Sequence, residues 1–177
     1  MKRAKIIKTH ASQKMVSCVL LFDKDGYIVG TARKNNPTAF GMPGGKLEIG
    51  DNFYQAAIRE TLEETGIDLT TSTLTPIFRA SDGPFDVITF YPENGILLER
   101  PILKPGQGEG VCRWITVKEL ASGFFPIYNM SLLKRLPEHL KKFYQNKSWY
   151  KKLEDKDVMS MSNDEVREII LNTVGCF

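Results

Sequence analysis

The alternation of apolar and polar positions divides the chain into short strand-like runs and amphipathic segments. Residues 15–22 form an apolar run that ends at the turn-forming residues 23–26, and residues 27–32 form a second run. Two such runs separated by a turn predict a β-hairpin. Similar β-rich runs predict further strands at 74–79, 85–91 and 111–117.

Residues that break regular structure follow the second run. Residues 33–43 are rich in asparagine, proline and glycine, which predicts a loop. The Gly44-Gly45 pair that comes next predicts a tight turn, because glycine tolerates positive φ and the close approach of a ligand. This segment is therefore expected to separate the first strands from the first helix.

Residues 52–65 carry the signals of a helix with defined ends. Asn52 is a good N-cap, and Gln55 three residues later completes a capping box. Gly66 stands where glycine commonly ends a helix. The sequence therefore predicts both ends of this helix as well as its existence.

The last third of the chain is predicted to be helical. Residues 129–146 have the leucine pattern of a helix, and Pro137 inside it predicts a kink or a break. Ser162 opens another capping box and with it a terminal helix. A short helical turn is predicted at 117–122. Trp149 and the tyrosine after it could cover a cleft, contact a partner or pack the last helical segment, and packing is the preferred interpretation. Strands and helices thus alternate, which favours an α/β fold.

The composition is that of a globular domain. Hydrophobic residues make up 42% and charged residues 25% of the 177 residues, which excludes disordered, collagen-like and coiled-coil proteins. The apolar run at 15–22 is too short to span a bilayer, so no membrane partner is expected. Three cysteines without a C-x-x-C pair argue against a disulfide framework and a zinc ribbon. A reducing, cytoplasmic location is therefore predicted.

The net charge of +3 is unevenly distributed along the chain. Residues 134–157 are basic, which indicates either contact with nucleic acid or, as we prefer, the solvated face of a helix. Residues 48–68 are acidic, and Arg59 is their one basic residue. Because dense carboxylates repel one another, this segment indicates either a solvated acidic helix or a divalent metal site.

Three glutamates share one face of the helix predicted at 52–65. Glu60, Glu63 and Glu64 are spaced by three and four residues, and no lysine follows at the next such positions to offset their repulsion. Oxygen ligands of this kind suit Mg²⁺ or Mn²⁺. Arg59 cannot bind a metal and is expected to pair with Asp51 or a neighbouring glutamate.

The spacing of these residues matches a known signature. Gly45 is followed by five residues and Asp51, then by seven residues and Arg59-Glu60-Thr61-Leu62-Glu63-Glu64-Thr65-Gly66-Ile67. This pattern resembles the Nudix box of the MutT-like Nudix hydrolases. It departs from the box where Asp51 replaces a glutamate and where Thr61 replaces an apolar residue. None of the acids that would bind metal is lost.

The resemblance implies a fold and a division of the chain. A Nudix domain is an α/β/α sandwich with a mixed central sheet, and it would occupy residues 1–145. Residues 146–177 would form a C-terminal helical extension packed on the same domain. The metal site would hold Mg²⁺, with Mn²⁺ as the alternative, through Gly44, Glu60, Glu63 and Glu64.

The resemblance also implies hydrolysis of a nucleoside diphosphate linked to another group. The cation would polarise phosphoryl oxygens, and a general base would take the proton of the attacking water. That base is either a glutamate of the box or an acid from a distant loop. Glu109 is the distant candidate, as base and as a further metal ligand; an ordinary loop acid is the alternative.

A second segment suggests how the substrate would be bound. Residues 125–129 resemble a MutT-type segment whose asparagine, here Asn129, contacts an oxidised guanine base. An amide suits that role because it both donates and accepts hydrogen bonds. The alternative is that Asn129 is an N-cap. By the same resemblance Arg33 would contact the nucleotide, and Met42 would pack against the base.

Three functions are considered. The first is Mg²⁺-dependent hydrolysis of a (d)NTP, or of an oxidised dNTP such as 8-oxo-dGTP, to NMP and pyrophosphate. The second is an ADP-ribose or nucleotide-sugar pyrophosphatase, for which Pro84 resembles a downstream proline, although a turn explains this residue better. The third is a non-catalytic domain that binds nucleotide or RNA, and the retained acids argue against it. Nucleic acid is thus not an expected partner, but RNA is left open.

Overall fold

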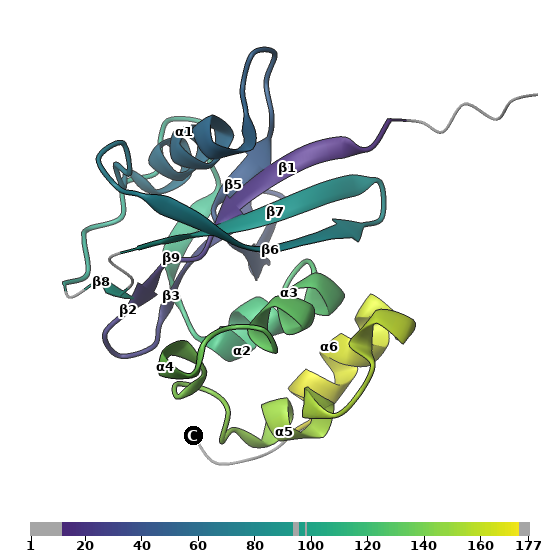
Figure 1. Cartoon of the computed structure of the whole chain (residues 1–177). Helices are drawn as coiled ribbons and strands as arrows, with labels where there is room; N and C mark the ends of the chain where they lie inside the picture. The colour runs from purple at the N-terminus through teal and green to yellow at the C-terminus, as the bar shows by residue number, and fades with distance from the viewer. Residues whose placement is uncertain (1–11, 94–95, 98, 174–177) are drawn as a thin grey trace, which may run out of the picture.

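Two β-sheets lie between helix α1 on one side and helices α2 to α6 on the other (Figure 1). The structure is a computed structural model, and it describes residues 12–93, 96–97 and 99–173. The layers confirm the predicted α/β/α arrangement with mixed strand directions. Within the described ranges, no helix has the length and apolarity needed to cross a membrane.

The first sheet has the strand order β5-β1-β7-β6. Its strands are β1 (Lys14–Val19), β5 (Gly44–Lys46), β6 (Leu74–Asp82) and β7 (Phe85–Pro92). Strands β1 and β7 are parallel, whereas β1 with β5 and β6 with β7 are antiparallel. This sheet holds the strands that contact α1 most extensively, so it positions the acidic helix.

The second sheet has the order β4-β3-β2-β8, with β9 paired to β3. Its strands are β2 (Phe22–Asp23), β3 (Ile28–Arg33), β4 (Asn36–Gly41), β8 (Ile96–Leu97) and β9 (Val111–Ile115). Strand β9 runs antiparallel to β3, and β2 runs parallel to β8. The strands predicted at 74–79, 85–91 and 111–117 are therefore all confirmed.

The predicted hairpin between residues 15–22 and 27–32 is wrong for most of its length. Only Phe22 pairs with Ile28, while β1 pairs with β5 and β7 in the other sheet. Leu20 and Leu21, where the chain passes between the sheets, are fully buried in two different hydrophobic clusters. Burial on both faces makes the apolar run continuous and hides the point where the strand changes sheet.

The loop and turn predicted at 33–45 are also wrong. Residues 36–41 form β4, which pairs with β3, and Pro37 is tolerated there because β4 lies at the edge of its sheet. Gly44 and Gly45 lie in β5, opposite Cys18 and Ser17 of β1. The glycines therefore serve close packing within a strand pair and form no turn.

Helix α1 (Phe53–Thr65) has the predicted ends. Asn52 and Gln55 form the capping box in both directions, and Gly66 ends the helix in the left-handed conformation. The remaining helices are α2 (Val117–Ala121), α3 (Pro126–Leu133), α4 (Glu138–Lys141), α5 (Ser148–Glu154), the 3₁₀ helix η1 (Val158–Ser160) and α6 (Asn163–Leu171). The break predicted at Pro137 is confirmed, but it separates two distinct helices, and the first begins at Pro126.

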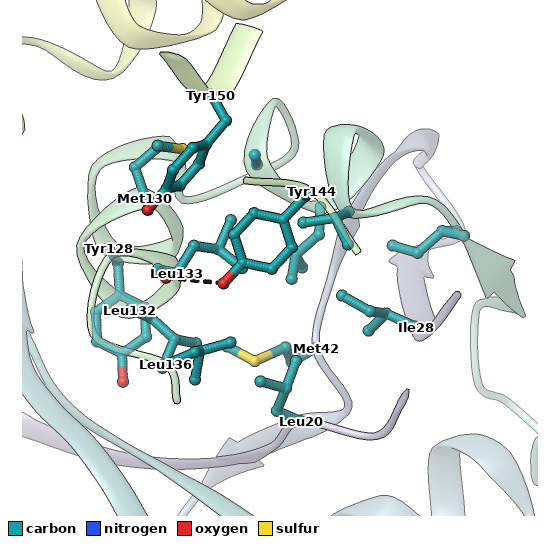
Figure 2. Packing of buried hydrophobic residues seen from close by; sticks show 14 of the residues in the cluster. Leu20, Ile28, Met42, Tyr128, Met130, Leu132, Leu133, Leu136, Tyr144 and Tyr150 are labelled. Atoms are coloured by element: carbon teal, nitrogen blue, oxygen red, sulfur yellow. Dashed lines mark hydrogen bonds between the residues drawn. The ribbon is translucent and has the colours of Figure 1, made fainter. Parts of the chain in front are cut away.

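Each face of the sheets has its own hydrophobic cluster. The cluster beneath α1 includes Val19, Ala57 and Phe90, and the larger one is covered by α2 to α6. In the larger cluster the buried Tyr144 hydroxyl donates a hydrogen bond of 2.8 Å to the Leu133 carbonyl, as Figure 2 shows. Trp149, Leu153, Val158, Val166 and Ile170 belong to the same cluster as Leu20 and Phe22. The predicted packing of Trp149 is thus confirmed; the division of the chain at residue 145 stays a prediction.

Candidate active site

Two glutamates of α1 face the glycine pair of β5. The Gly44 amide donates a hydrogen bond of 2.8 Å to Oε2 of Glu64. A methyl group placed on Gly45 would lie 2.4 Å from Oε1 of Glu60, so a side chain there would displace the carboxylate. The fully buried Ala56 and Ala57 let α1 lie this close to the sheet. Local capping and small residues together therefore bring both carboxylates onto the strand.

Arg59 pairs with Asp51, as predicted. Its Nη2 lies 2.9 Å from Oδ2 of Asp51, and its Nη1 lies 2.9 Å from Oε1 of Glu60. The guanidinium also donates to the Lys46 carbonyl at 3.2 Å. Arg59 thus ties the segment before α1, strand β5 and Glu60 into one unit, and its hydrogen bond lowers the pKa of Asp51 below the ordinary value.

Glu63 is more exposed than the other two glutamates. Its carboxylate is about half exposed and lies 3.4 Å from Nη1 of Arg59, the same nitrogen that contacts Glu60. In the part of the chain that the structure describes, no three His, Cys, Asp or Glu side chains converge as a ready group of metal ligands. The structure therefore brings Glu60 and Glu64 together and leaves Glu63 at the rim.

The buried position of Glu64 changes its acidity. Burial, together with the charges of Glu60 and Glu109, raises the pKa of Glu64 to about 7 against the opposing Gly44 hydrogen bond. Burial also raises the pKa of Glu60, although Arg59 acts in the other direction. Two desolvated carboxylates with like charge fit a hard divalent cation, which would stabilise their ionised forms.

Glu109 reaches the same place from a distant loop. The Gly106 amide donates to the Glu63 carbonyl at 2.7 Å, and the Glu109 amide donates to the Gly106 carbonyl at 3.1 Å, so the loop is attached to the C-terminal end of α1. Glu109 and Glu64 line the same cavity. The negative charge of Glu109 contributes to the raised pKa of both buried glutamates.

Gly110 allows this loop to approach strand β3, and an alanine there is expected to displace Glu109. A methyl group at Gly110 would lie 1.9 Å from the Ala32 carbonyl oxygen, a rigid backbone atom. We expect Gly110→Ala to lower the free energy of unfolding by roughly 1–3 kcal/mol, as overpacking generally does. Urea unfolding measures this loss. Gly41→Ala is the matched control, because nothing lies within 4 Å of a methyl group at that glycine; equal stability of the two variants would contradict the expectation.

Two adjoining cavities open beside the glutamates. The smaller encloses about 300 Å³ and the larger about 390 Å³. Both are lined by Arg33, Met42, Gly44, Glu64 and Phe125. The smaller one adds Glu109 and Phe124, and the larger one adds Glu60, Asp82, Tyr128 and Asn129. Glu64 thus lies where the two cavities meet, with Glu60 in the wall of the larger one and Glu109 in the wall of the smaller one.

The residues predicted to bind substrate all line the larger cavity. Arg33 lies over the Phe124 ring at 5.5 Å, and Met42 is buried in the larger hydrophobic cluster beside the cavity (Figure 2). Asn129 is also buried, and its amide nitrogen donates to the Leu120 carbonyl at 2.9 Å. The N-cap alternative for Asn129 is wrong, because α3 begins earlier and Phe125 holds the N-cap position.

Other residues that line the larger cavity carry no recognisable signal of a site in the sequence. Cys18 projects from β1 beside the glutamates; burial raises the pKa of its thiol to about 12, and Glu64 and Glu60 add to the shift. Asp82 lies at the end of β6, next to the turn at Gly83 and Pro84. Val16 and Cys18 are two positions apart, which indicates that they share one face of β1. Nothing in the residues around Asp82 distinguishes it from an ordinary turn residue.

The fold and the site define a class of protein: α/β/α domains in which an acidic helix faces a glycine-containing strand at a cleft. The family model described as NUDIX domain matches residues 12–146. This match covers most of the chain. The chain therefore belongs to the Nudix family.

Curated relatives match a smaller part of the chain. An ADP-ribose pyrophosphatase of Methanocaldococcus jannaschii is 36% identical over 64 residues, which are 35% of this chain and 38% of that protein. An RNA pyrophosphohydrolase of a Wolbachia species from Brugia malayi is 38% identical over 50 residues, which are 28% of this chain and 31% of that protein. The chain thus matches 38% of the length of the first relative and 31% of the second.

Solved structures agree with the fold. A structure of MutT, from work on Aliivibrio salmonicida and Vibrio cholerae, superposes with a TM-score of 0.51 at 21% identity. The alignment covers 75% of this chain and 97% of that one. At this identity the likeness concerns the fold alone.

Proposed function

We propose that this protein is a Nudix pyrophosphohydrolase that cleaves the diphosphate bond of a nucleotide with the help of a divalent cation. Its preferred substrate is a (d)NTP or an oxidised dNTP, and the products are NMP and pyrophosphate. The observation that carries the proposal is the pair of desolvated carboxylates, Glu60 and Glu64, held on β5 in the wall of the larger cavity. Of these two, Arg59 pairs with Glu60 alone, and the like charges of the two glutamates favour a further cation beside them.

Each acid has a place in this proposal. Glu60 and Glu64 would hold Mg²⁺, or Mn²⁺ as the alternative, together with the Gly44 carbonyl, while Glu63 would join from the rim. The cation would polarise phosphoryl oxygens and orient the water that attacks phosphorus. Glu109 would accept the proton of that water from the loop side of the site. Arg59 would act as a positioning residue, since it holds Glu60 at 2.9 Å.

The larger cavity would receive the nucleoside. Arg33 offers a guanidinium for phosphate or base, and Met42 offers an apolar wall. The Asn129 amide donates one N–H to the Leu120 carbonyl, so its carbonyl oxygen and its second N–H are left for a ligand. A cytoplasmic location stays a prediction.

Hydrolysis of ADP-ribose or a nucleotide sugar is the second candidate. It is favoured by the relative from Methanocaldococcus jannaschii, which is named for that activity. Pro84 adds no support, because it lies in the turn between β6 and β7. A non-catalytic domain that binds RNA is a weaker alternative, since it gives the buried carboxylates no task.

A substrate panel with Mg²⁺ separates these functions. The full chain is incubated with dNTPs, 8-oxo-dGTP, ADP-ribose, a nucleotide sugar and a 5′-triphosphate RNA, and the products are identified by mass. Release of pyrophosphate and NMP supports the first proposal, and release of a sugar phosphate with NMP supports the second. Salt-dependent RNA binding without hydrolysis of any compound would overturn both.

A further inference from the structure

The larger cavity is lined by an acidic side chain besides the two glutamates, that of Asp82. The cavity lies between the lower face of the first sheet and α3, which Figure 1 places beneath β1, β7 and β6. Its sheet wall consists of Val16 and Cys18 from β1 and of Phe85 and Val87 from β7. Asp82 at the end of β6 interrupts this largely apolar wall with a carboxylate.

Asp82 differs from the other partly or fully buried aspartates of the described chain. Asp23 pairs with Arg100, Asp51 with Arg59 at 2.9 Å, and Asp86 with Arg79 at 2.6 Å. Asp82 has no cationic partner within 4 Å and no side-chain hydrogen bond among the residues that the structure describes. Its partial burial raises the pKa of the carboxyl, and its charge acts on the Tyr128 hydroxyl across the cavity. A half-buried carboxylate without a partner is unfavourable unless a ligand supplies donors.

Two further polar groups of the larger cavity are uncharged. Asn129 donates one N–H to the Leu120 carbonyl and keeps a second N–H and its carbonyl oxygen. The Tyr128 hydroxyl is shared with the Thr89 hydroxyl at 2.7 Å. The ionised Asp82 carboxylate only accepts hydrogen bonds, so a ligand that lies against it must bring the donors.

Guanine has two adjacent donors on one edge, the ring N1–H and the 2-amino group, which match the two oxygens of a carboxylate. Adenine has a ring acceptor beside its one amino group, and this acceptor would be repelled by the carboxylate. Hypoxanthine keeps the N1–H donor and lacks the amino group. The cavity thus favours a guanine-type base over both.

We propose that Asp82 is a specificity-determining residue that binds the N1–H and 2-amino donors of a guanine-type base. This inference rests on the proposed function, since it requires that the nucleoside enters the larger cavity. It goes beyond the roles assigned to Arg33, Met42 and Asn129, because it names the base edge that is read. The contact is made in binding and not at phosphorus, so its loss should raise KM and leave kcat nearly unchanged.

The test removes the carboxylate of Asp82 from the protein and the 2-amino group from the base of the nucleotide. Hydrolysis of dGTP, dITP and dATP is measured for the wild type, Asp82→Ala and Asp82→Asn. A bond from a ligand N–H to a charged acceptor contributes enough that its loss lowers kcat/KM for dGTP roughly 10- to 100-fold. We expect that loss in both variants. We also expect the kcat/KM values for dGTP and dITP to become nearly equal. Asp86→Asn is the matched control, because Asp86 is on the same hairpin and pairs with Arg79.

A second measurement keeps the two proposals distinguishable. Calorimetry with dGMP and dIMP reports base selection without turnover, and thermal unfolding reports whether each variant is folded. If the wild type hydrolyses no nucleotide but binds dGMP more tightly than dIMP through Asp82, the proposed function fails and the inference stands. An unchanged preference for guanine over hypoxanthine in folded Asp82→Ala would overturn the inference, whatever the enzymatic result.

Discussion

Glu64→Gln is expected to lower kcat roughly 10²–10³-fold, the loss typical when one electrostatic contact to the reacting group is removed. The substitution keeps the shape of the side chain and an oxygen that can accept the Gly44 hydrogen bond of 2.8 Å. It removes the negative charge that the cation requires. Steady-state hydrolysis of the best substrate from the panel, at saturating Mg²⁺, measures the effect.

A surface glutamate provides the control for this experiment. Glu138 is largely exposed in α4 and lies far along the chain from the site, so Glu138→Gln changes the same charge without touching the cavities. Its kcat is expected to equal that of the wild type. If Glu64→Gln retained activity within a few-fold of this control, Glu64 would have no part in the chemistry.

The same Glu64→Gln substitution is expected to stabilise the protein in the absence of metal at high pH. Burial raises the pKa of Glu64 from 4.5 to about 7, so the folded state holds a proton that the unfolded state has released between these values. Stability therefore falls as pH rises from about 4.5 to about 7, and it stays low above that range. The glutamine has no such cost, and at pH 8 we expect it to raise the free energy of unfolding by about 2–3 kcal/mol.

Urea unfolding in EDTA at pH 8 and pH 4.5 tests this expectation. The stabilisation should be large at pH 8 and close to zero at pH 4.5, where both states carry a protonated Glu64. Added Mg²⁺ should stabilise the wild type and not the variant, since the cation compensates the buried charge. If the variant were less stable than the wild type at pH 8, the buried charge of Glu64 would not destabilise the folded state. Loss of activity with gain of stability would mark Glu64 as a residue kept for function.

Features that depend on neighbours along the chain were predicted well. The ends of α1, the capping box at Asn52 and the break at Pro137 follow from residues within a few positions of each other. The pairing of Arg59 with Asp51 was expected because both lie in one short segment that carries the Nudix box. A spacing of a few residues has few possible geometries, so it determines these contacts.

Features that depend on distant partners were predicted poorly. The parallel pairing of β1 with β7 joins segments about seventy residues apart, and the apolar run at 15–22 suits that pairing and a hairpin equally. Strand β4 was hidden by an edge proline, and Asn129 was assigned to a helix start that lies several residues earlier. In each case the residues nearby in sequence were compatible with more than one strand pairing or helix boundary.

From the order of residues alone it follows that this protein carries an acidic Nudix helix, where that helix begins and ends, and which arginine supports it. The folded structure was needed to show that Glu60 and Glu64 meet β5 while Glu63 is half exposed. It also decided that Glu109 arrives from a distant loop and that Asp82 faces the larger cavity. Helix capping and side-chain spacing are local interactions, whereas burial, pKa shifts and cavities arise only when segments remote in sequence pack against each other.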